Sequence, residues 1–136
     1  MKEVLDDNLM REKDQLIMID KNRAVFTFER VSAAELAKNV NDIFIEKSYK
    51  LEQGSTEGGK YGKGNQVLRI LFGAFAKRFC WETKIESNST HTRFIFTKDA
   101  KGYAGGIIGV NQVNNEYKRM TDAFTLFHTT HQLKNN

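Results

Sequence analysis

The chain has 136 residues, of which 40% are hydrophobic and 28% are charged, a composition typical of one soluble globular domain. Its single cysteine, Cys80, excludes an intramolecular disulfide and a zinc site built from cysteines. The apolar run at residues 70–76 is far shorter than the roughly 18 residues that a membrane-spanning helix needs.

The formal net charge of +4 is unevenly distributed along the chain. Residues 1–57 hold 9 basic and 12 acidic side chains, whereas residues 58–136 hold 12 basic and 5 acidic ones. A basic half can attract phosphate groups, but no basic run here exceeds a pair, which is also typical of an ordinary solvated surface. The chain start shows no basic leader followed by an apolar stretch, so we expect a cytoplasmic protein without a membrane span.

Residues 1–22 predict an N-terminal arm or a short helix or strand. The apolar residues 16–19 are followed by turn-forming residues 20–22, so they either pair with the next strand in a hairpin or end an N-terminal helix. Residues 23–30 predict a strand, because Phe26 and Phe28 alternate with Val25 and Thr27.

A helix from about residue 33 to residue 47 follows. Ser32 and Glu35 form a capping box, in which each side chain can satisfy the other residue's free backbone amide. Apolar residues then recur at helical spacing and form a stripe that a sheet or another helix must cover.

Three further strands are predicted at residues 49–53, 79–86 and 90–97, and a glycine-rich loop at residues 54–64 follows the first of them. In residues 79–86 one face is apolar, and the other carries Cys80, Glu82, Lys84 and Glu86. Phe94 shares one face of the last strand with Phe96.

A second glycine-rich loop, residues 99–109, precedes a long helix that begins near residue 111. Its buried stripe steps by three or four residues along the helix. The members of this stripe are Val113, Tyr117, Met120, Phe124 and Phe127. Glu116 with Arg119, and Lys118 with Asp122, have the spacing of exposed ion pairs.

The predicted fold is a two-layer α+β domain over residues 23–132, with a frayed tail at residues 133–136. A curved antiparallel sheet of about four to six strands carries two helices on one face, in the order β-α-β(3-4)-α. This order resembles the helix-grip and TATA-binding-protein-like architectures, in which a sheet wraps around a C-terminal helix. The resemblance implies a domain that binds an apolar small molecule or presents a docking surface.

Two candidate sites emerge from these patterns. The abundance of aromatic side chains suggests an apolar ligand cavity between the sheet and the last helix, although ordinary core packing is the simpler interpretation. Its candidate residues are Trp81, Phe94, Phe96, Tyr117 and Phe124. The alternative is a phosphate or nucleic-acid site formed by Lys60, Lys63, Lys77, Arg78, Lys98 and Lys101.

Nothing in the sequence assembles a catalytic centre. Residues 102–109 are rich in glycine but lack the spacing of a dinucleotide or phosphate loop. His128 and His131 could share a metal ion, but His91 is the only further histidine. Cys80 lies within a predicted strand, away from any helix N-terminus that could activate its thiol. We therefore expect no catalytic residue, cofactor or metal, and no enzyme.

The sequence thus favours a non-catalytic binding or interaction module of bacterial type. We expect it to contact an apolar small ligand or a protein partner, through the region of the sheet and the C-terminal helix or through the exposed sheet face. An exposed edge strand could also pair with a second copy, which allows a homodimer.

Overall fold

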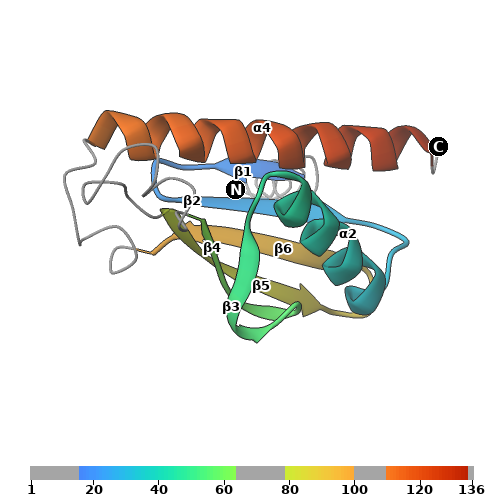
Figure 1. Ribbon diagram of the computed structural model, residues 1–136. Helices are drawn as coiled ribbons and strands as arrows, with labels where there is room; N and C mark the ends of the chain where they lie inside the picture. The colour runs from blue at the N-terminus through green and yellow to red at the C-terminus, as the bar shows by residue number, and fades with distance from the viewer. Residues whose placement is uncertain (1–15, 64–78, 100–109, 135–136) are drawn as a thin grey trace, which may run out of the picture.

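Figure 1 shows the computed structural model of the chain, which describes residues 16–63, 79–99 and 110–134. The elements in chain order are β1 (Ile17–Ile19), β2 (Arg23–Phe28), α2 (Ala33–Glu46), β3 (Lys50–Ser55), β4 (Gly58–Lys63), β5 (Phe79–Ser87), β6 (Thr92–Lys98) and α4 (Val110–Lys134). The described strands form one open antiparallel sheet in the order β1-β2-β6-β5-β4-β3. The predicted α+β class, with an antiparallel sheet and two helices, is confirmed.

The chain enters the sheet through a hairpin, which decides between the two alternatives left open for residues 16–19. β1 pairs with β2, with Met18 opposite Val25 and Ile19 opposite Ala24. The backbone amide of Asp20 donates to the carbonyl of Arg23 at 2.8 Å and closes the turn. The element order therefore gains one strand before the one that the alternation predicted.

The first described helix begins where the capping box predicts. The Ser32 hydroxyl accepts a hydrogen bond from the backbone amide of Glu35 at 3.1 Å. The helix ends at Glu46, and Ser48 then takes a left-handed φ of 71°, which turns the chain into β3.

The glycine-rich segment differs from the predicted loop, because β4 runs through most of it. β3 and β4 form a hairpin with a register shift between Leu51 and Gln53. A Cβ on Gly59 would collide with the carbonyl oxygen of Gln53, so the absence of a side chain lets the two strands approach. Gly59 therefore allows β3 and β4 to pair.

β5 and β6 confirm the predicted alternation. Ile85 pairs with Phe94, Thr83 pairs with Phe96, and all four side chains are buried. The strand β6 begins at Thr92, two residues later than predicted, because the Asn88 side chain accepts hydrogen bonds from the backbone amides of Thr90 and His91 and holds them in the turn.

Both helices cover one face of the sheet, here called the inner face (Figure 1). Phe44 of α2 and Tyr117 of α4 both contact Phe96, with ring centroids 6.1 and 5.6 Å apart. α4 follows the direction of β2, because the Tyr117 hydroxyl donates to the Asp20 carbonyl while His128 bonds the Thr27 carbonyl.

α4 spans 25 residues and includes Lys134, where the sequence predicted a frayed tail; residues 135 and 136 lie outside the described part. Val113, Tyr117, Met120 and Phe124 are buried as the helical stripe predicts, and Phe127 is half-buried. Of the helices in the described ranges, none combines the length and the apolarity needed to cross a membrane.

Candidate functional site

The five predicted ligand residues come together on the inner face. Trp81, Phe94, Phe96 and Phe124 are each at most 1% exposed, and Tyr117 is 6% exposed. The ring centroids of Phe94 and Phe124 lie 4.7 Å apart, and those of Trp81 and Phe96 lie 5.1 Å apart. Between α4 and the sheet, these rings therefore contact one another.

A buried polar network lies beside these rings, and the sequence did not predict it. The Tyr49 hydroxyl donates to Glu116 Oε2 at 2.6 Å, and Lys63 Nζ lies 3.4 Å from the same oxygen. Arg119 donates to both carboxylate oxygens of Glu116, at 3.0 and 3.1 Å. The predicted Glu116–Arg119 pair thus forms, but Glu116 is buried rather than exposed.

The electrostatics of this network favour an ionised Glu116. Burial opposes ionisation, but the hydrogen bond from Tyr49 and the charges of Lys63 and Arg119 outweigh it, so the pKa of Glu116 lies below its ordinary value. Burial, and then the neighbouring carboxylate, raises the pKa of Tyr49 far above its ordinary value. Tyr49 therefore keeps its proton and remains a hydrogen-bond donor to Glu116.

The predicted basic site is divided between two faces of the sheet. Lys60 lies on the face opposite the helices, 3.0 Å from Asp99 Oδ2. Lys63 lies on the inner face and pairs with Glu116. Lys98, also on the inner face, lies 4.7 Å above the Tyr117 ring and donates to Asn114 at 2.7 Å. The remaining predicted residues, Lys77, Arg78 and Lys101, lie outside the described residues.

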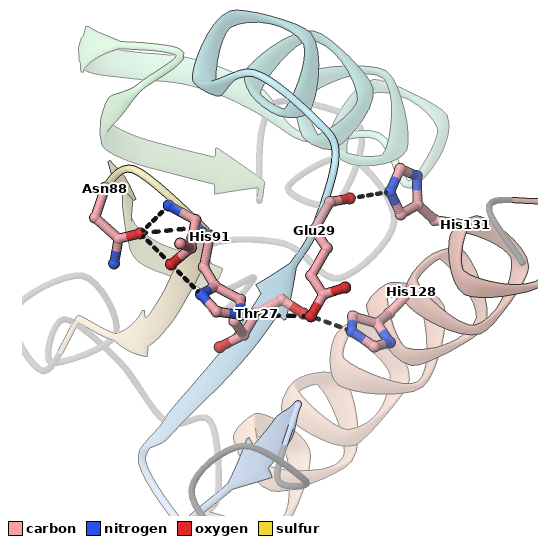
Figure 2. Close-up of polar contacts among 7 residues, drawn as sticks. Thr27, Glu29, Asn88, His91, His128 and His131 are labelled. Atoms are coloured by element: carbon pink, nitrogen blue, oxygen red, sulfur yellow. Dashed lines mark hydrogen bonds and ion pairs between the residues drawn. The ribbon is translucent and has the colours of Figure 1, made fainter.

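The three histidines gather near the end of β2, as Figure 2 shows. The Nε2–H groups of His128 and His131 donate to the carbonyls of Thr27 and Glu29, at 2.8 and 3.0 Å, and His91 Nε2 lies 3.4 Å from Glu29 Oε1. Within the described ranges, no three histidine, cysteine or acidic side chains are placed to hold a metal ion. The two histidines of α4 thus link this helix by hydrogen bonds to the end of β2 and to Glu29, the residue that follows it.

Cys80 is buried, although the alternation of β5 assigns it to the polar face. Its Sγ lies 3.6 Å from Asp99 Oδ2, and its carbonyl accepts a hydrogen bond from the Asp99 amide at 3.2 Å. Asp99 is itself buried and pairs with Lys60. The predicted wet environment of Cys80 was therefore wrong, because the end of β6 and the Lys60 side chain lie against it.

The other side of the sheet, here called the outer face, carries no helix among the described residues. Its members alternate with the buried residues along each strand, and directly paired residues share a face. An apolar stripe crosses three strands, with Met18 opposite Val25 and Val25 opposite Ile95. Met18 is 51% exposed, while Val25 and Ile95 are half-buried.

Charged side chains surround this stripe on the outer face. Arg23 pairs with Thr97, which pairs in turn with Glu82. Arg93 lies opposite Glu86 in the register of β6 and β5, and Lys84 Nζ lies 3.1 Å from Glu86 Oε1. The β2–β6 half of the outer face is therefore basic, and β5 supplies the acidic side chains.

Two hollows open along β5. The central hollow, of about 190 Å³, is lined by Arg23, Glu82, Thr83, Lys84, Glu86, Ile95 and Thr97. The hairpin hollow, of about 380 Å³, is lined by Gln53, Gly54, Glu57, Gly58, Gly59, Lys60, Glu82, Thr83, Lys84 and Ile85. The two share Glu82, Thr83 and Lys84, so β5 forms a ridge between them. Neither hollow lies between α4 and the sheet.

Comparison with known proteins adds no family to this geometry: a scan against protein-family models found no match, and a search of curated proteins found no similar sequence.

Proposed function

We propose that this protein is a non-catalytic interaction module that binds a protein partner through its outer face. One observation carries the proposal: the inner face is closed by α2 and α4, whereas the outer face presents an apolar stripe, charged borders and two hollows. Protein interfaces combine an apolar centre with a polar rim in this way, and arginine is enriched in them.

A protein partner fits the geometry better than an apolar small ligand. The candidate ligand residues already contact one another, so a ligand between α4 and the sheet would have to displace buried rings. The central hollow is instead lined mainly by charged and polar residues of the outer face, and the hairpin hollow combines such residues with three glycines and Ile85. Hollows with such mixed linings suit the side chains of a protein partner.

The nucleic-acid alternative has less support from the described residues. Single-stranded nucleic acids stack their bases on exposed aromatic side chains, but the aromatic residues of the described strands belong to the inner side of the sheet. Lys60 and Lys63 each face a carboxylate of the chain itself. We expect no salt-dependent shift of DNA or RNA on a gel, and a clear shift would favour the nucleic-acid alternative.

We also propose the helix-grip-like arrangement as the finer description of the fold. In its support, α4 runs along the inner face and contributes Val113, Met120 and Phe124 to the core. In this arrangement the clasped helix stabilises the sheet, which leaves the outer face available for binding.

Site-specific photo-crosslinking in cells tests the proposed function. A photoreactive amino acid at Val25 or Ile95 should give discrete protein adducts, because both positions lie at the centre of the outer face. The same probe at Leu126, which is 69% exposed on the solvent side of α4, is the matched control. Adducts that are absent at Val25 and Ile95, or equally strong at Leu126, would refute binding through the outer face.

A further inference from the structure

We infer that the partner of the outer face is a second copy of this chain, arranged with β6 over β6. This inference rests on the proposed function, because it names the partner of the same surface. It follows from the order of the strands and from the distribution of charge on the outer face.

The argument begins with symmetry. A homodimer contact is isologous, so each surface feature must meet its complement on the same face. A twofold axis parallel to β6, lying between two facing sheets, places β2 of one copy over β5 of the other, because β6 stands between β2 and β5 in the sheet. Rotation about this axis does not shift residues along the strands.

The charges of the outer face fit this arrangement. Arg23, Thr97 and Glu82 occupy one row across β2, β6 and β5. The axis therefore places Arg23 of each copy over Glu82 of the other, giving two symmetric ion pairs. Both side chains are exposed in the single chain, so they are available to form these pairs.

The apolar residues fit the same axis. Ile95 occupies the middle of β6, so the axis brings the two Ile95 side chains together. It also places Val25 of each copy over Lys84 of the other, because Lys84 is the direct partner of Ile95 on β5, and the aliphatic stem of Lys84 can pack on Val25 while its ammonium group stays at Glu86. Arg93 also approaches its symmetry mate, and Glu86, which pairs with Lys84, lies beside Arg93 in the register of β5 and β6 and offsets part of the repulsion. The two Ile95 side chains thus meet at the centre of the contact, and charged side chains surround them.

The area of the sheet limits the size of such a contact. Strands about 4.8 Å apart and about 20 Å long give the outer face roughly 550 Å². Contact across the whole face would bury roughly 1,100 Å² over both copies, just below the range of standard specific interfaces. We therefore expect a reversible dimer rather than a permanent one.

Charge reversal tests this dimer in the full chain by sedimentation velocity over a range of protein concentrations. Arg23→Glu or Glu82→Arg should each weaken self-association at least about tenfold, because each creates two like-charge contacts. The double variant Arg23→Glu/Glu82→Arg should restore it. Lys38→Glu, an exposed change on α2, is the charge-matched control and should leave it unchanged. Thermal melts of each variant show whether the fold is retained.

The outcomes separate the two proposals. Concentration-dependent association that is lost in either single variant and restored in the double variant supports the dimer. A wild-type chain that stays monomeric at millimolar concentration overturns it, as does association that both single variants retain. If photoreactive Ile95 crosslinks only to a different protein, the dimer is refuted and the interaction function stands. If Ile95 gives no adduct at all, both proposals fail.

Discussion

Replacing Tyr49 by phenylalanine isolates the hydrogen bond that joins the β3 region to α4. The change removes the hydroxyl that donates to Glu116 at 2.6 Å and leaves the buried ring in place. A hydrogen bond to a charged group contributes about 1.5–3 kcal/mol, so we expect Tyr49→Phe to lower the free energy of unfolding by that amount. Urea denaturation measures the loss.

Tyr61→Phe is the matched control for this prediction. Its hydroxyl donates to the neutral Asn41 side chain at 2.7 Å, so we expect a loss of only about 0.5–1.5 kcal/mol. A loss for Tyr49→Phe no larger than the loss for Tyr61→Phe would show that the charge of Glu116 adds nothing to its hydrogen bond.

The same substitution has a pH dependence with a defined sign. Because the pKa of Glu116 in the folded chain lies below its ordinary value of 4.5, the unfolded chain takes up the proton first as the pH falls. The stabilisation by ionised Glu116 is therefore complete above pH 4.5 and is lost as the pH falls through the lowered pKa. The stability difference between wild type and Tyr49→Phe should shrink in acid. An unchanged difference between about pH 7 and about pH 3 would refute this assignment.

Three further predictions concern the core, the hairpin and a histidine. Phe124→Ala should lower the free energy of unfolding, measured by urea denaturation, by about 3–5 kcal/mol. Leu126→Ala, on the solvent side of α4, should change it by no more than about 0.5 kcal/mol. Equal losses would place Phe124 outside the core. Gly59→Ala should clearly lower the melting temperature, because the added Cβ would meet the backbone of β3. Gly58→Ala is the control and should not lower it, because the added Cβ would meet open space. Similar melting temperatures for the two variants would refute the close approach of the strands. Burial lowers the pKa of His128, so the free energy of unfolding should fall as the pH drops from 6.5 through that lowered pKa. His128→Gln should weaken this pH dependence. An unchanged pH dependence in the variant would contradict the prediction.

Local sequence signals were sufficient for much of the fold. Ser32 and Glu35 fixed the start of α2, because their hydrogen bond depends only on residues three positions apart. The alternation in β5 and β6 identified the buried side of both strands, because side chains of a strand point to opposite faces in turn. These features could be predicted because each depends on neighbouring residues.

Other features depend on residues far apart in the chain and carry no local signal. Glu116 looks like half of an exposed ion pair, but its other partners, Tyr49 and Lys63, precede it by 67 and 53 positions. The strand at Gly58–Lys63 contradicts the low strand propensity of glycine and forms because β3 and β5 pair with it on both sides. Once β4 is a strand, Lys60 and Lys63 must lie on opposite faces, which divides the predicted basic site.

The position of α4 in the chain has a consequence for biosynthesis. Phe26 and Phe94 pair across neighbouring strands, and Phe124 contacts both rings. While the ribosome is still making residues 110–134, the aromatic surface formed by Phe26 and Phe94 lacks its cover by α4. Translation that stops before α4 would leave that surface exposed for good and make the fragment prone to aggregate.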